Sequence, residues 1–307
     1  MHIKTILAIF TFLCALSVGG YAQYSPTADQ VRQQQEERRR QEIIELRIRS
    51  AMLDNLQRRY APNRSTFKRA SLSKEERELR DKLVAPNSED LILVKDFLKQ
   101  PKTGIFRLFP DNDCFANNVV KVDGKCENTV PNIWYYSFRK NDYSNGMFFD
   151  ILLKNGSLIT DGFLAQGILV KLGNFSLDRV SLEGKGAKFL VNFKPAEKTS
   201  DIKVQYDELD RGIESEGFKY SHSAKAEVGG VYLMRVIAYR AQKKSLNKIL
   251  KNSPLESKSN FEMLEKDERK DITIAFRIIR EEINGNLTII WKELERKESP
   301  EVTFLDK

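Results

Sequence analysis

Residues 271–294 read DITIAFRIIREEINGNLTIIWKEL, two apolar runs that flank the dipeptide Asn284-Gly285. Both runs are rich in isoleucine and carry a large aromatic residue, and such residues favour β-strands. Asn-Gly is typical of a tight hairpin turn, because both residues readily adopt positive φ. This stretch therefore predicts an antiparallel β-hairpin near the end of the folded core, and it is the strongest hairpin signal in the chain.

The same strand chemistry recurs upstream. Asn155-Gly156 lies between β-favouring runs and predicts a second hairpin, with a turn that needs positive φ. Further strands are predicted for the apolar and aromatic runs at residues 105–109, 133–139, 147–153, 157–160, 167–172, 187–193 and 231–240. One amphipathic helix is predicted to interrupt them, because the apolar residues between 202 and 213 are spaced by four, three and four.

The segment before residue 101 has helical rather than strand character. Residues 27–60 consist largely of Gln, Glu, Arg, Leu and Ile without glycine or proline, which is a strongly helix-forming composition. The apolar stripe within it does not persist as the heptad repeat that a coiled coil requires. Two shorter helices are predicted at about 73–84 and 89–98, each followed by a proline.

Together these patterns predict an α+β protein. Residues 23–100 are expected to form a helical, basic segment. Residues 101–307 are expected to form a mostly antiparallel, β-rich domain with one interrupting helix and a polar insertion at about 241–270. A connection of that length inside a compact domain is usually functional or mobile.

Residues 1–22 have the three parts of a cleavable signal peptide. A positive start at Lys4 precedes an apolar run from Ile6 to Val18, and the small residues Gly20 and Ala22 are placed for cleavage. That run is shorter than the roughly 20 apolar residues that a transmembrane helix needs. We therefore expect the mature protein to be secreted or periplasmic, without a membrane anchor after cleavage.

Two cysteines, Cys114 and Cys126, follow the predicted signal peptide. In an oxidising compartment such a pair at short spacing predicts a disulfide bond. A zinc site is the competing interpretation, but two cysteines without a neighbouring histidine supply half of a zinc shell. Calcium is a second alternative, through the acidic residues around these cysteines, which are Asp111, Asp113, Asp123 and Glu127. We predict the disulfide, and no metal or cofactor.

The chain carries 51 Lys and Arg against 43 Asp and Glu, and residues 55–74 contain cations but no acid. An anionic partner is one interpretation of this run, and a basic linker that keeps the chain soluble is the other. The cations proposed to bind such a partner are Arg58, Arg59, Arg64, Lys68 and Arg69. Motifs that read or stack nucleic-acid bases are missing, so the candidate partners of the N-terminal helix are an anionic envelope polymer, a lipid surface or a protein.

Three aromatic residues, Trp134, Tyr136 and Phe138, alternate along one predicted strand and so share a face. Exposed, they would form a platform for sugar rings or a peptide. Large aromatics also dominate protein interiors, and burial of at least two of these rings is the favoured interpretation.

Catalytic motifs are sparse. Beyond the signal peptide the chain has one histidine, His222, and no Gly-x-Ser-x-Gly sequence, so the sequence offers little basis for a Ser-His triad. Paired carboxylates for glycoside hydrolysis are recognised only by their separation in space. The densest acidic group, within residues 207–216, is interpreted as the solvated face of the predicted helix. We predict no catalytic residues.

One resemblance concerns three strand-like stretches: VYLMRVIAYR at 231–240, IAFRIIR at 274–280 and LTIIWK at 287–292. They resemble the ending of a group of uncharacterised, predicted exported bacterial proteins, over the region from about residue 105 onward. The chain departs from that pattern where residues 241–270 are inserted. The resemblance implies a bacterial envelope setting and no particular activity.

The expected function is therefore that of an exported, non-catalytic binding or scaffolding protein of the cell envelope or extracellular space. The alternative is a hydrolase of an envelope polymer that uses paired carboxylates as acid and base.

Overall fold

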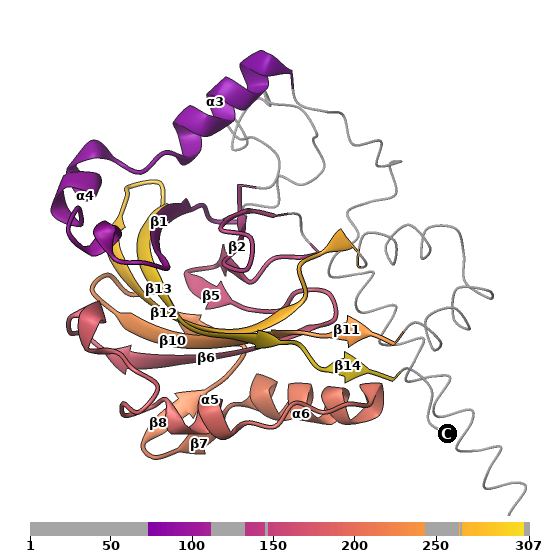
Figure 1. Ribbon diagram of the computed structural model, residues 1–307. Helices are drawn as coiled ribbons and strands as arrows, with labels where there is room; N and C mark the ends of the chain where they lie inside the picture. Colours follow the sequence, from indigo (N-terminus) through magenta and orange to yellow (C-terminus); the bar gives the residue numbers. More distant parts are fainter. Residues whose placement is uncertain (1–72, 112–132, 145–146, 243–263, 265, 304–307) are drawn as a thin grey trace, which may run out of the picture. The chain divides into compact units, whose positions relative to one another are not determined.

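The computed structural model describes residues 73–111, 133–144, 147–242, 264 and 266–303 (Figure 1). The predicted signal peptide, the helix of residues 27–60, the cysteine pair and most of the polar insertion lie outside the described residues, so these remain predictions. Within the described ranges, no helix combines the length and the apolar character needed to span a bilayer.

A five-stranded antiparallel sheet with the strand order β1-β13-β12-β10-β6 forms the centre of the fold. Its strands are β1 (Thr103–Leu108), β6 (Ala165–Gly173), β10 (Val231–Ala238), β12 (Lys270–Glu281) and β13 (Leu287–Glu298). The pairing of β12 with β13 confirms the predicted C-terminal hairpin. Gly285 has a φ of 80°, and its N–H donates to the Glu282 carbonyl at 2.8 Å, so glycine supplies the left-handed residue of this turn.

A second antiparallel sheet, in the order β3-β2-β4-β5-β9, packs on one face of the first. Its strands are β2 (Tyr135–Ser137), β3 (Asp142–Tyr143), β4 (Ile151–Lys154), β5 (Ser157–Ile159) and β9 (Ser223–Lys225). Aromatic rings fill the space between the two sheets, with Phe106 stacked on Tyr136 at 3.6 Å between ring centroids. The β4–β5 pairing confirms the predicted hairpin at Asn155-Gly156.

Helices and a small hairpin cover the other face of the five-stranded sheet (Figure 1). The covering elements are η4 (Leu177–Arg179), α5 (Lys188–Asn192), α6 (Thr199–Arg211), β7 (Ile213–Ser215) and β8 (Phe218–Tyr220). Because both faces are covered, every residue of β10 is buried. A doubly covered strand reads as a continuous apolar run rather than as an alternating one, which explains the sequence VYLMRVIA.

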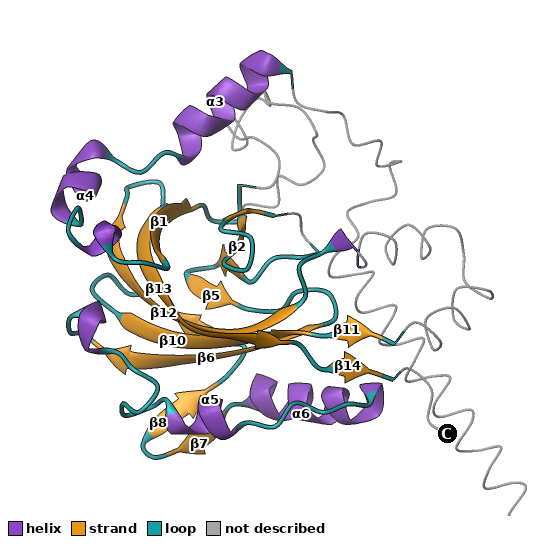
Figure 2. Cartoon of the chain, in the orientation of Figure 1, coloured by secondary structure: helices purple, strands orange, loops and turns teal. Residues whose placement is uncertain are grey.

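The remaining elements lie at the edges of this framework (Figure 2). They are α3 (Lys74–Val84), α4 (Ser88–Leu93), η1 (Phe97–Lys99), and the short parallel strands β11 (Arg240–Ala241) and β14 (Glu301–Val302). The helix predicted at 89–98 is thus divided into α4 and η1, with a turn between them.

The predicted α+β class is wrong for the described residues, which are mostly antiparallel sheet, with 41% strand against 23% helix. Much of the predicted helix falls in residues 1–72, outside the described part, and the described helices are short pieces that border or cover sheets. A single interrupting helix is also wrong, because residues 187–193, predicted as a strand, contain α5. Leu190 of α5 is buried while Val191 is exposed, which is the one-sided burial of an amphipathic helix.

Candidate functional site

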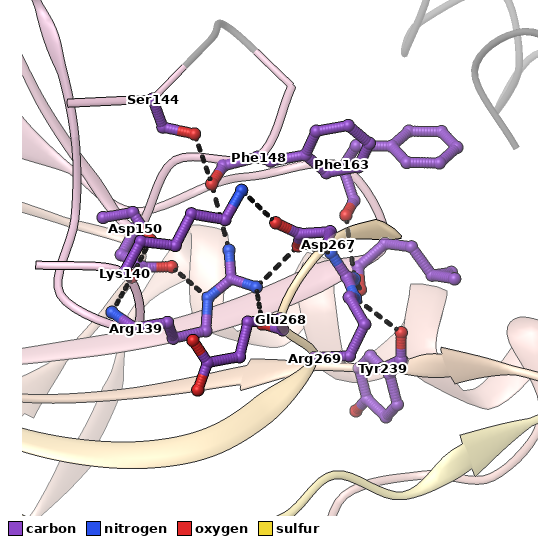
Figure 3. A network of polar contacts seen from close by, with 12 residues as sticks. Arg139, Lys140, Ser144, Phe148, Asp150, Phe163, Tyr239, Asp267, Glu268 and Arg269 are labelled. Carbon is purple, nitrogen blue, oxygen red and sulfur yellow. Dashed lines mark hydrogen bonds and ion pairs between the residues drawn. The ribbon is translucent and has the colours of Figure 1, made fainter. Parts of the chain in front are cut away.

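Four charged side chains are buried together where the turn after β2 meets the start of β12 (Figure 3). Arg139 follows β2, Asp150 precedes β4, and Asp267 and Arg269 precede β12. Their side chains are 0 to 5% exposed. We call these four residues the buried ion-pair cluster. A buried charge needs partners to offset its lost hydration, so the contacts of each group indicate what the cluster can do.

Each of the three guanidinium nitrogens of Arg139 donates at least one hydrogen bond to another residue of the protein. Its Nε donates to Asp150 Oδ1 and its Nη1 donates to Asp267 Oδ2, both at 2.7 Å. Nη1 also reaches the carbonyl of Glu268, and Nη2 donates to the carbonyl of Phe148 at 3.0 Å. Within the protein, Arg139 thus donates from all three of its guanidinium nitrogens, and four of its five N–H groups have a partner.

Arg269 contacts Asp267 from the opposite side and also uses all its nitrogens (Figure 3). Its Nη1 donates to Asp267 Oδ2 at 2.9 Å and its Nε donates to the carbonyl of Tyr239 at 2.9 Å. Its Nη2 donates to the carbonyls of Phe163 and Leu164. Because Tyr239 directly follows β10 and Arg269 directly precedes β12, this contact joins the two ends of the long connection between these strands.

Asp267 is the shared counter-charge of the cluster. Besides the two arginines it contacts Lys140, whose Nζ lies 2.5 Å from Asp267 Oδ1 and whose side chain is 34% exposed. Burial by itself raises the pKa of Asp267, but the positive charges of Arg139 and Arg269 and the Lys140 hydrogen bond outweigh it, so this pKa is lowered. Burial and the charge of Arg139 lower the pKa of Arg269 to about 10.

Both Asp267 and Arg269 therefore stay charged near neutral pH. A general acid or base needs a pKa close to the working pH, and neither group meets that condition. The contacts of the cluster suit it to holding three chain segments together rather than to proton transfer.

The structure buries all three residues of the predicted aromatic platform, Trp134, Tyr136 and Phe138, at 4, 3 and 1% exposure. Tyr136 and Phe138 belong to the core between the two sheets, and Trp134 belongs to a smaller apolar cluster with Phe149. They form no exposed platform, because Tyr136 and Phe138 pack against the five-stranded sheet and Trp134 packs within the smaller cluster.

The other predicted site residues lie outside the described part of the chain. They are Arg58, Arg59, Arg64, Lys68, Arg69, Cys114 and Cys126. Of the acids considered for calcium, only Asp111 is described; it is buried and lies 3.3 Å from Lys154 Nζ. No cluster of three or more metal-ligating side chains occurs among the residues that the structure describes.

His222 is buried between β6 and α6, and both its ring nitrogens face backbone carbonyls. Nδ1 lies 2.6 Å from the Gly167 oxygen and Nε2 lies 3.2 Å from the Tyr206 oxygen. Its ring also stacks on that of Tyr206, whose hydroxyl donates to Asp161. Because each ring nitrogen faces a backbone carbonyl, and neutral His222 has one N–H to donate, the ring is not arranged to activate a serine and instead links α6 to the sheet.

This environment predicts a pH dependence of folding. Burial lowers the pKa of His222 below 6.5 and outweighs the opposing effects of Asp161, the two carbonyls and Asp210. The unfolded chain then binds a proton that the folded chain does not, so the stability contribution is complete above pH 6.5 and is lost as pH falls through the lower folded-state pKa. The test is to measure the free energy of unfolding by urea titration at pH values above and below 6.5. This free energy should fall less steeply with decreasing pH in His222→Gln than in the wild type. If it falls equally steeply in both proteins, His222 is not the group responsible.

Sequence reasoning missed a second buried ion pair, between Arg235 of β10 and Asp271 of β12. Nε and Nη2 of Arg235 donate to the two carboxylate oxygens at 2.9 and 2.6 Å. Nη1 donates to the carbonyls of Leu190 and Phe193, at the C-terminal end of α5. Arg235 thus caps α5 and attaches it to the sheet. The available signal was a lone arginine in an apolar strand, which has to find a partner inside the protein.

Replacing Arg235 with lysine should destabilise the fold by about 2 kcal/mol, because lysine keeps the charge but loses the planar fork that binds Asp271 twice and reaches α5. The free energy of unfolding from urea titration measures the effect. Arg277→Lys is the matched control, since Arg277 is half-exposed on β12 and its bonds, to Gly229 and Asn174, are 3.2 and 3.5 Å long. Equal losses in the two variants would argue against the capping role.

Exposed apolar side chains occur on two elements that contact each other, α4 and the turn of the β12–β13 hairpin. Ile92 and Leu93 of α4 are 76 and 75% exposed, and Ile283 at the hairpin turn is fully exposed. We call these three residues the α4 patch. Arg280 of β12 donates to Asp90 of α4 at 2.9 Å, so the two elements are held together.

Comparisons of the chain with protein-family models, with curated proteins and with solved structures found no match.

Proposed function

We propose that the chain is an exported, non-catalytic binding or scaffolding protein of the cell envelope or extracellular space, and that the α4 patch contacts a protein partner. The exposure of Ile92, Leu93 and Ile283 on ion-paired elements carries this proposal. Large apolar side chains exposed to solvent are a recognised mark of interaction surfaces. A rigid support also reduces the entropy lost on binding.

The charges beside the patch favour a protein over an anionic polymer or lipid. Arg280 is paired with Asp90 and with Glu89, at 2.9 and 3.1 Å. Arg107 is likewise paired with Glu282, next to Ile283. Cations that already have acidic partners contribute little net positive potential to attract a polyanion. Protein interfaces, in contrast, combine an apolar centre with a polar rim.

The contacts of the buried carboxylates weigh against the alternative, a hydrolase. A general acid in glycoside hydrolysis needs a raised pKa, and the arginines lower that of Asp267. Asp150 is fully buried and bonded to Arg139 and Ser137. Neither side chain can approach a polymer in the described conformation.

The proposal can be tested by sedimenting the purified full-length protein with envelope membranes of the organism that makes it, with the same membranes stripped by protease, and with vesicles of their extracted lipids. A protein partner predicts binding to intact membranes only. Ile92→Asp combined with Leu93→Asp should weaken that binding several-fold. Val204→Asp is the control, because Val204 is an exposed apolar residue of α6.

Binding to the lipid vesicles would identify a lipid surface instead. Equal binding by the wild type and the double variant would overturn the assignment of the patch. Release of soluble fragments from purified envelope polymer would favour the hydrolase.

A further inference from the structure

The dipeptide Asn-Gly occurs at two turns in the described residues, Asn155-Gly156 and Asn284-Gly285. In this dipeptide the backbone nitrogen of glycine can attack the preceding side-chain amide, because glycine has no Cβ to hinder the approach. The reaction requires the side chain and the N–H group to be accessible and able to move. A third Asn-Gly, at 145–146, lies outside the described residues.

At the β4–β5 turn, the structure leaves both reacting groups accessible. Asn155 is exposed and has a φ of 51°, and Gly156 has a φ of 70°, the conformation of a two-residue type I′ turn. Apart from Gly156 and its two chain neighbours, no residue has a heavy atom within 4 Å of the position that a Cβ on Gly156 would take. Among the described residues, no hydrogen bond holds the Asn155 side chain or the Gly156 N–H. Gly156 is bound through its carbonyl, which accepts from Ala226 N–H at 2.9 Å.

At the β12–β13 turn, hydrogen bonds restrain both the asparagine side chain and the glycine N–H group. The side-chain oxygen of Asn284 accepts a hydrogen bond from the Asn286 N–H at 3.2 Å. The Gly285 N–H donates to the Glu282 carbonyl at 2.8 Å. Attack at this turn would require both bonds to break first, although Asn284 is exposed like Asn155.

We propose that Asn155 is a site of spontaneous deamidation, and that the fold makes it more reactive than Asn284. The nitrogen of Gly156 forms a bond to Cγ of Asn155, its proton passes to the departing amide, and ammonia leaves as the Cγ–Nδ2 bond breaks. Water then opens the resulting five-membered succinimide. Opening at Cγ gives aspartate, and opening at the backbone carbonyl gives isoaspartate.

Either product changes the β4–β5 turn. Both add one negative charge to an exposed turn. Isoaspartate also lengthens the backbone by one carbon in a two-residue turn, where the Gly156 carbonyl is the acceptor of Ala226 N–H. Aspartate keeps the backbone length and tolerates the left-handed conformation, so it leaves the hairpin intact.

The test is to incubate the purified full-length protein at mildly alkaline pH and to follow each Asn-Gly by peptide mapping with mass spectrometry. The expected result is that the peptide carrying Asn155 gains the mass of an amide-to-acid conversion several-fold faster than the peptide carrying Asn284. Asn145 is also followed by glycine, so the protease digest must place residues 145 and 155 in different peptides. An Asn155→Asp variant provides the elution standard for the aspartate product.

A sample denatured in urea provides the control for the fold, because both dipeptides are then unrestrained and should convert at similar rates. Equal conversion of the two sites in the native protein would overturn the proposal. So would a native difference that persists unchanged in urea, because local sequence rather than the turn structure would then set the rates.

Discussion

Replacing Asp267 with asparagine is expected to lower the free energy of unfolding by about 3 kcal/mol, because two buried arginines lose their shared counter-charge. Arg139 and Arg269 both donate to Asp267 Oδ2, at 2.7 and 2.9 Å. Asparagine has nearly the same shape, so the loss reports charge rather than packing. Urea titration followed by circular dichroism measures the change.

The matched control is Asp207→Asn on α6. Asp207 also forms an ion pair, with Lys203, but its side chain is 53% exposed. An exposed pair within one helix contributes only about 0.3–0.5 kcal/mol. If Asp267→Asn cost no more than this control, the cluster would not hold the fold together as described.

Replacing Gly167 with alanine is expected to cost about 3 kcal/mol, at the upper end of typical overpacking penalties. A Cβ at Gly167 would lie 1.8 Å from Thr160 Oγ1, and 2.5 and 2.6 Å from Thr160 Cγ2 and Cβ. Gly167 belongs to β6, which pairs with β10, and its carbonyl contacts His222, so the backbone has little room to move away. The free energy of unfolding measures the effect.

A second substitution tests the steric explanation. Thr160→Gly removes all three of the clashing atoms, so adding it to Gly167→Ala should cost less than the sum of the two separate changes. Gly184→Ala is the control, because its new Cβ would come no closer than 3.2 Å to any neighbour and its φ is not positive. Strict additivity of the Thr160 and Gly167 substitutions would refute the clash.

The buried ion-pair cluster and the α4 patch have complementary roles in this interpretation. The cluster joins the turn after β2, the end of β10 and the start of β12 into one framework. Arg280 of β12 extends that framework to α4, where the patch is exposed. We therefore expect cluster variants to reduce partner binding indirectly, through lost folded protein, whereas patch variants reduce binding while the fold stays intact.

Several structural predictions followed from residues close together in the sequence. The Asn-Gly turns between β-favouring runs predicted both hairpins, and the apolar spacing within residues 202–213 predicted α6. These features depend on φ preferences and on periodicity, which act between near neighbours. The short run at 187–193 shows the limit of this reasoning, because seven mostly apolar residues suit a strand or a buried helix equally well.

By itself the sequence determined the two hairpins and the helix α6, because each depends on local conformational preference. The tertiary structure alone decided that Arg139 meets Asp267, 128 residues further along, that Arg235 caps α5, and that the aromatics of β2 are buried. The physical reason is that burial and ion pairing depend on which distant segments pack together. No local pattern specifies those neighbours.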